Sequence, residues 1–199
     1  MVAHTVGRGV PRRFRGESMG RYIRVYVPGG TYFFTVVTYR RQPILTSETG
    51  RRCLRDAFRS VRAEWPWKVV AVVLLPEHFH AVWSLPPGDA DYSLRMQKVK
   101  EGFTKAFLAS GGREIVPTAA ERRYGRRGVW QPRFWEHTVR DEADLKRCVD
   151  YAHWNPVKHG LVERVVDYPW SSFHRYVRLG EYAGNWGVED PCPDFEMPE

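Results

Sequence analysis

Apolar and polar residues along the 199-residue chain alternate between the period of a strand and the period of a helix. β-Branched and aromatic residues fill positions 31–38 after the turn signal P-G-G, which predicts a strand. From Thr46 or Ser47, either of which can cap a helix, apolar residues recur at helical spacing and stop before Pro66. That stretch therefore predicts a helix.

The rest of the chain continues this alternation. The pattern predicts a buried strand over 67–75, a tight turn at Pro76-Glu77, and a second strand that ends at P-P-G. A helix over 93–108 and a long basic loop over 111–133 follow. The last two elements are a strand over 133–140 and a helix from its cap Asp141 to about Lys158. The order is strand, helix, strand, strand, helix, strand, helix. It predicts an α+β fold, in which a ferredoxin-like antiparallel sheet carries helices on one face.

Length and composition favour one domain with a core of its own, because 43% of the residues are apolar. We expect a basic N-terminal arm over 1–20, the domain over 21–186 and an acidic tail over 187–199. The tail is expected to be a disordered end. The alternative is that it folds back on a DNA-binding groove as a competing polyanion.

Membrane and disulfide chemistry are not expected. The sequence has no apolar run of about 18 residues, and its start lacks the apolar centre of a signal peptide, so we expect a cytoplasmic protein that contacts no membrane. Cys53, Cys148 and Cys192 are odd in number and scattered. That distribution predicts reduced thiols and no Cys-x-x-Cys metal site.

The charge balance favours a polyanionic partner. Lys and Arg number 31 against 23 Asp and Glu, which gives a net charge of +8. Guanidinium groups suit phosphate oxygens and stack on bases, so the excess of arginine favours nucleic acid. The candidate DNA contacts lie in the arm (Arg12 and Arg13), in the segment E-R-R-Y-G-R-R-G (Arg122, Arg123, Arg126 and Arg127) and at Arg133. A solvated surface would explain either cluster alone equally well.

Two histidines stand two apart in the apolar stretch L-L-P-E-H-F-H-A-V-W-S. In a strand, His78 and His80 point to one face while Phe79 points to the other. By itself such a pair is a weak metal signal, and a structural role is more common. An oxygen ligand from elsewhere would complete a divalent site with room for a phosphate.

The last predicted helix contains a matching set of polar residues. Tyr151 and Asn155 are four residues apart and share a face, and Lys158 lies on nearly the same side. A tyrosine oxygen can attack a phosphodiester, a divalent metal on His78, His80 and Asn155 could polarise the phosphate, and Lys158 could add positive charge. The alternatives are a packing role for Tyr151 and a helix-ending role for Asn155 before the following proline.

These motifs resemble those of a known family. P-E-H-F-H resembles the histidine motif of the HUH single-strand endonucleases, and D-Y-A-H-W-N-P-V-K-H-G-L-V, W-Q-P-R-F-W-E-H and Y-P-W-S-S-F-H-R are similar to signatures of the REP-associated tyrosine transposases. The similarity covers residues 21–186 in the same order. It implies that His78 and His80 are metal ligands, that Tyr151 is the nucleophile and that Asn155 is a third, amide ligand.

The resemblance also implies a ferredoxin-like fold, dependence on Mg or Mn, and a substrate of single-stranded DNA with a hairpin from a repeated extragenic palindrome. We therefore expect a bacterial transposase, nucleoid-associated when bound to DNA, that cleaves and rejoins strands through a 5′-phosphotyrosine as a monomer or homodimer. One alternative is a domesticated protein that binds such hairpins without cutting them. Another is an RNA-binding domain with aromatics on its open sheet face.

Aromatic residues near the basic segments are candidates for stacking on single-stranded bases. They are Trp130, Phe134, Trp135 and Trp154. We assign Phe134 or Trp135 to the core. The long loop after residue 111, the arm and the tail depart from the family pattern and could alter the choice of hairpin.

Overall fold

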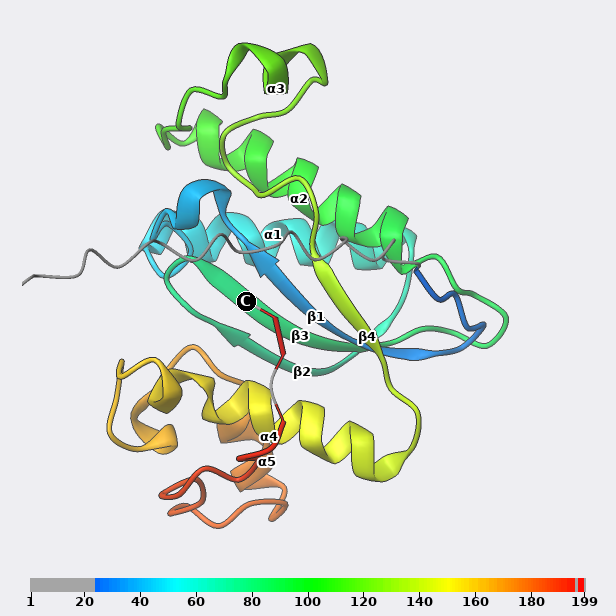
Figure 1. Ribbon diagram of the computed structural model, residues 1–199, viewed down its shortest axis with the longest axis vertical. Helices are drawn as coiled ribbons and strands as arrows, with labels where there is room; N and C mark the ends of the chain where they lie inside the picture. Colours follow the sequence, from blue (N-terminus) through cyan, green and yellow to red (C-terminus); the bar gives the residue numbers. More distant parts are fainter. Residues whose placement is uncertain (1–23, 196, 199) are drawn as a thin grey trace, which may run out of the picture.

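Four antiparallel strands form the centre of the fold (Figure 1). The computed structural model describes residues 24–195, 197 and 198. The strands are β1 (Thr31–Val37), β2 (Lys68–Leu74), β3 (His78–Ser84) and β4 (Trp135–Thr138), and their order across the sheet is β2-β3-β1-β4. The prediction of a single α+β domain with an antiparallel sheet is confirmed.

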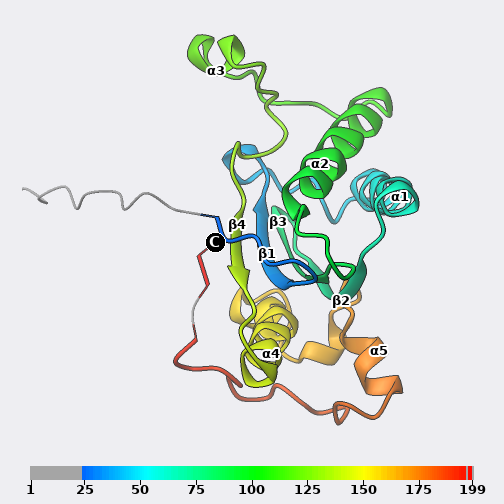
Figure 2. The same ribbon diagram turned by 90° about the vertical axis from the view of Figure 1, so that its right-hand side faces the viewer.

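Helices cover both faces of this sheet (Figure 2). On one side lie α1 (Glu48–Glu64) and α2 (Tyr92–Ala109), and on the other lie α4 (Glu142–Lys158) and α5 (Phe173–Arg178). Short 3-10 turns occupy Tyr39–Arg41 and Val165–Asp167. Within the described ranges, no helix is long and apolar enough to cross a membrane.

The two helical layers differ from the single layer expected, and β1 shows why. Tyr32, Phe34 and Val36 pack in the core beneath α1 and α2, whereas Phe33 packs in the core against α4. Large apolar side chains therefore leave both faces of the strand. A sheet with two apolar faces needs a layer of helices on each.

The hairpin between β2 and β3 forms as predicted. Its turn is closed by a hydrogen bond from Leu75 N to His78 O of 2.8 Å. Phe79 belongs to the core beneath α1 and α2, so His78 and His80 share the opposite face. Both histidines are fully buried on the side of the sheet that α4 covers.

Helix α4 begins at the predicted cap and continues past Asn155. The Asp141 side chain accepts a hydrogen bond from Asp144 N at 2.8 Å, which satisfies one of the exposed donors of the first turn. Pro156 lies inside the helix, which ends only at Lys158. The helix-ending role considered for Asn155 is therefore wrong.

The basic loop contains a helix that the periodicity did not predict. This is α3 (Ala119–Arg123), only five residues long. A capping box holds its start, because the Thr118 side chain accepts from Glu121 N and the Glu121 side chain accepts from Thr118 N. The T-x-x-E signature of such a box is readable in the sequence.

Candidate active site

Tyr151 lies on the face of α4 that packs against the sheet, and its side chain is 3% exposed. Its ring meets the His80 ring edge to face, with 5.6 Å between centroids. Its hydroxyl accepts a hydrogen bond from Lys158 Nζ at 3.0 Å. The structure thus brings together Tyr151 and Lys158, which helical spacing associated, and His80, which the proposed metal chemistry associated with them.

The two histidines lie next to each other, with ring centroids 4.8 Å apart. His78 Nδ1 is 3.1 Å from Glu77 Oε1, and His80 Nδ1 is 3.2 Å from Thr35 Oγ1. A contact to Nδ1 from a protein oxygen is the usual way in which a metal-binding histidine is oriented through its second nitrogen. Two imidazoles held in this way, with an amide nearby, form a donor set that fits a divalent cation.

Helix α4 and the residue that follows it touch the histidine pair at two points. Tyr151 meets His80, and His159, eight residues later, meets the His78 ring with 5.2 Å between centroids. Asn155 is fully buried and lies one helical turn from each of these contacts. The Asn155 amide is therefore on the side of α4 that faces the pair. His159 was not predicted as a site residue, although it lies four residues after Asn155, the same spacing that relates Asn155 to Tyr151.

The C-terminal segment passes over α4 (Figure 1) and contacts Tyr151. The Tyr151 hydroxyl donates to Met197 O at 3.2 Å, and the Phe195 ring lies 6.0 Å from the Tyr151 ring. Met197 is itself buried. The expectation of a disordered end is wrong for the part of the tail that the structure describes. The described part of this segment therefore helps to bury the Tyr151 side chain.

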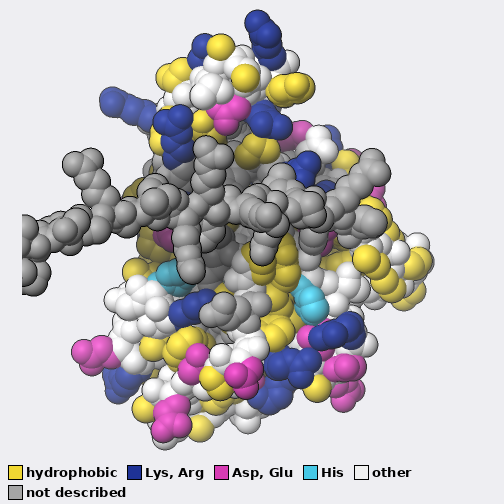
Figure 3. Space-filling model, in the orientation of Figure 1, with side chains coloured by type: hydrophobic (Ala, Val, Ile, Leu, Met, Phe, Trp, Pro, Cys, Tyr) yellow, Lys and Arg dark blue, Asp and Glu magenta, His cyan; other side chains and the backbone are white. Residues whose placement is uncertain are grey.

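Of the basic residues predicted to contact DNA, Lys158 lies at Tyr151, and the arginines that the structure describes lie elsewhere. Arg12 and Arg13 fall outside the described residues. The others are exposed, on α3 and in the loop that follows it: Arg122, Arg123, Arg126, Arg127 and Arg133. Lys and Arg side chains gather over α3 at the end of the molecule opposite α4 (Figure 3). Arg127 forms a 2.8 Å ion pair with Glu114, which ties this loop together.

The four aromatic residues proposed to stack on bases differ in how far the structure buries them. Trp130 is buried against Phe103 with 4.9 Å between ring centroids, so it is a core residue and does not present its face to bases. Phe134 packs against the core at Phe34, as expected. Trp135 and Trp154 are half-buried.

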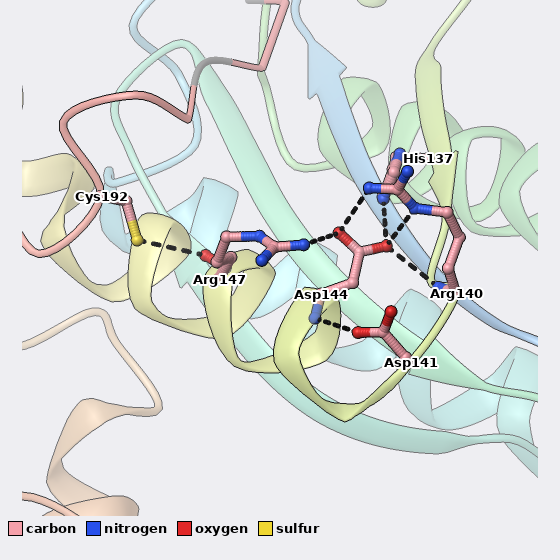
Figure 4. Close-up of polar contacts among 6 residues, drawn as sticks. All are labelled: His137, Arg140, Asp141, Asp144, Arg147 and Cys192. Carbon is pink, nitrogen blue, oxygen red and sulfur yellow. Dashed lines mark hydrogen bonds and ion pairs between the residues drawn. The ribbon is translucent and has the colours of Figure 1, made fainter.

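A second polar cluster lies at the start of α4 (Figure 4). The fully buried Asp144 contacts His137 Nε2 at 2.8 Å, Arg140 Nε at 3.1 Å and Arg147 Nη2 at 3.3 Å. His137, Asp144 and Cys148 offer possible metal-ligand atoms within 4.8 Å of one another. Two arginines already neutralise Asp144, however, and burial raises the pKa of the Cys148 thiol to about 12. The cluster is suited to anchoring α4 and not to binding a cation.

Several known proteins are similar to this chain. Residues 27–155 match the family described as "Transposase IS200 like". A REP-associated tyrosine transposase of Escherichia coli K12 is 42% identical over 182 residues, which cover 91% of this chain and 98% of the relative. A putative REP-associated tyrosine transposase of Haemophilus influenzae is 39% identical over 180 residues, covering 90% and 98%. A solved structure of a REP-associated tyrosine transposase bound to a REP hairpin covers 91% of this chain and 100% of its own, with 38% identity and a TM-score of 0.70.

Proposed function

Because this chain belongs to the IS200-like transposases and to their REP-associated tyrosine branch, we propose that it cleaves and rejoins single-stranded DNA beside a REP hairpin through Tyr151. The observation that carries this proposal is the position of the Tyr151 hydroxyl, 3.0 Å from Lys158 Nζ and beside the buried histidine pair. A packing tyrosine would have no need of an ammonium group on its hydroxyl and an imidazole against its ring.

The proposed reaction begins when Tyr151 Oη gives up its proton and attacks a phosphodiester phosphorus, forming a bond from oxygen to phosphorus. The bond from phosphorus to the 3′ oxygen breaks, that oxygen takes up a proton, and the 5′-phosphate stays on the tyrosine. A phenol has a pKa of about 10, so the phenolate needs stabilisation near neutral pH. The ammonium group of Lys158 supplies it at short range. Attack by another 3′-hydroxyl on the phosphotyrosine reverses these steps and rejoins a strand.

The residues that would hold a divalent ion, Mg or Mn, are His78, His80 and Asn155. When bound, such an ion polarises the scissile phosphate and neutralises charge in the transition state. The protein's own contribution is orientation, because Glu77 and Thr35 hold the two imidazoles through Nδ1. All three proposed ligands are fully buried on β3 and α4, which fixes their positions before DNA binds.

We propose a hairpin of a repeated extragenic palindrome as the partner, since the structure that covers 91% of this chain is a relative bound to a REP hairpin. The exposed arginines on and after α3, together with Arg133, are proposed to contact phosphates of the same DNA. Arg12 and Arg13 remain predicted contacts. Exposure and positive charge support these assignments.

The nucleophile is tested by replacing Tyr151 with Phe, which removes only the hydroxyl. The protein is incubated with Mn or Mg and a hairpin oligonucleotide that carries a labelled single-stranded flank, and protein-linked label is measured on a denaturing gel. We expect an adduct with the unmodified protein and none with Tyr151→Phe, while hairpin affinity stays within about twofold. Tyr176→Phe removes a hydroxyl that bonds Val70 O, outside the site, and should leave the adduct in place.

The metal ligands are tested in the same assay by His78→Ala. We expect cleavage to be abolished with hairpin binding largely retained, because His78 is proposed to hold the ion and not the stem. Loss of binding together with loss of the folded state would instead assign His78 a structural role.

For the nucleophile test, an adduct formed by Tyr151→Phe would show that the nucleophile is another residue.

A second candidate function is hairpin binding without cleavage. The observation that favours it is the cover over the nucleophile, since Tyr151 is 3% exposed and its hydroxyl donates to Met197 O. If the unmodified protein binds the hairpin tightly and forms no adduct with either metal, this second function is the correct one.

A further inference from the structure

A groove runs along the β2 edge of the sheet, on the face opposite Tyr151. It lies between α1 and residues 170–172 and has a volume of about 520 Å³. Its floor is apolar and consists of Leu54 and Phe58 of α1 with Val69, Val72 and Leu74 of β2. We call it the β2-edge groove. Nothing in the proposed chemistry at Tyr151 uses this surface.

A row of arginines lines one side of this groove. Arg51, Arg55, Arg59 and Arg62 are spaced by four, four and three residues, so they share one side of α1. At a rise of about 1.5 Å per residue the row is about 16 Å long. That length equals about five base-pair steps of B-form DNA at 3.4 Å each. No acidic residue of the described chain lines the groove.

Arg51 and Arg62 donate to the backbone carbonyls of Thr46 and Trp67, but among the described residues no acid lies closer than 4.0 Å to the row. Elsewhere, arginines pair closely with acids, as Arg164 does with Asp167 at 2.7 Å. Arg59, by contrast, makes no ion pair or hydrogen bond within the described part of the chain. Arg55 reaches Asp56 only at 4.0 Å, and both side chains are exposed. Asp56 therefore does little to neutralise the charge of Arg55.

Trp170 forms the opposite rim and is 38% exposed. The Arg51 guanidinium lies over its ring, 3.9 Å from the centroid. The backbone of the Y-P-W-S-S segment is fixed against β2 by hydrogen bonds from Leu74 N to Trp170 O and from Ser172 N to Val72 O. The groove therefore has planar cations on one side and an aromatic ring on the other, which suits a sugar-phosphate backbone.

We infer that the β2-edge groove binds the phosphate backbone of the duplex stem of the DNA hairpin. This inference rests on the proposed function, since the stem is the duplex that such a transposase would hold. Leu74 lies at the Arg51 end of the groove, and only the short turn after it separates it from His78. A stem bound here places its single-stranded flank at the sheet edge next to the Tyr151 site.

The test compares the double variant Arg55→Gln/Arg59→Gln with the unmodified protein in hairpin binding by fluorescence anisotropy between 50 and 200 mM salt. Each lost phosphate contact in a duplex lowers the slope of log affinity against log salt by about 0.9, so two lower it by about 1.8. The affinity ratio between the two proteins should therefore change about 12-fold over this range.

Two control variants accompany this measurement. Arg164→Gln/Arg178→Gln removes two exposed positive charges elsewhere and should keep the original slope. Arg55→Lys/Arg59→Lys keeps the positive charge of the row, so it should also keep the original slope of log affinity against log salt. A slope for the glutamine variant equal to that of the unmodified protein would overturn the inference.

Two further readouts separate the possible outcomes. At saturating hairpin, the glutamine variant should still form the adduct at Tyr151, so an unchanged slope with a normal adduct refutes the stem site and leaves the proposed function intact. Analytical ultracentrifugation without DNA should show the same molecular mass for both proteins. A change in mass with an unchanged slope would assign the groove to contacts between copies of the chain and overturn the inference.

Discussion

The Asp144 cluster anchors the helix that carries Tyr151, and replacing Asp144 with Asn should show how strongly. The carboxylate is fully buried and contacts His137 Nε2, the Arg140 backbone N at 3.0 Å, Arg140 Nε and Arg147 Nη2. These partners join the end of β4 to the first turn of α4. Asparagine has nearly the same shape but carries no charge and accepts through one oxygen only.

The expected loss of stability follows from the exposure of each partner. Arg140 and Arg147 are 68% and 42% exposed, so water replaces much of what their ion pairs contribute. The contacts with the Arg140 backbone and His137 are better shielded, and a hydrogen bond to a charged group contributes about 1.5–3 kcal/mol. We therefore expect Asp144→Asn to lower the free energy of unfolding by about 3 kcal/mol at pH 7.

The effect should depend on pH in a defined direction. Burial by itself would raise the pKa of Asp144, but hydrogen bonds from Arg140 and His137 outweigh it and hold the pKa below its usual value. The carboxylate therefore contributes fully above the unfolded pKa of about 4 and loses its contribution as the pH falls below it. At pH 3 the difference between Asp144→Asn and the unmodified protein should be smaller by about 1 kcal/mol.

Urea unfolding followed by tryptophan fluorescence, at pH 7 and at pH 3, measures both quantities. A loss under about 1 kcal/mol at pH 7 would refute the anchoring role. A difference that is the same at both pH values would show that shape, and not the charge of Asp144, determines the loss.

Two further predictions concern packing, and the same urea unfolding assay checks them. Gly50→Ala should destabilise the fold by about 3 kcal/mol, because a Cβ there would lie 2.0 Å from Ile44 O; a loss under about 1 kcal/mol would mean that the start of α1 shifts freely. Ser172→Ala should cost about 1–3 kcal/mol, because Ser172 Oγ accepts from Val72 N at 2.9 Å and contacts His153 Nε2 at 2.8 Å; an unchanged stability would show that water replaces both contacts.

The elements that the sequence predicted well are those with a local physical signal. The alternation around His78, the cap at Ser47 and the cap at Asp141 each depend on neighbouring residues, and each forms as predicted. The association of Tyr151 with Lys158 also follows from helical spacing. Local periodicity therefore predicted most of the secondary structure and the core of the candidate site.

The features that were missed depend on contacts between distant parts of the chain. A second helical layer follows from the burial of both faces of β1, which becomes visible only when α4 is in place. Contact of Met197 with Tyr151 spans 46 residues and has no local signal. The role of Trp130 as a core residue depends on Phe103 of α2. The spacing of residues along the chain does not show which distant segments will meet or which side chains they will bury.

The central claim, that Tyr151 becomes linked to the 5′-phosphate of cleaved DNA, is tested most directly by mass spectrometry of the adduct. Trypsin should release the peptide from Cys148 to Lys158, in which Tyr151 is the only tyrosine. We predict that this peptide carries the nucleotide through a 5′-phosphate on Tyr151, with the other fragment ending in a 3′-hydroxyl. A nucleotide on any other residue, or a linkage through a 3′-phosphate, would contradict the account.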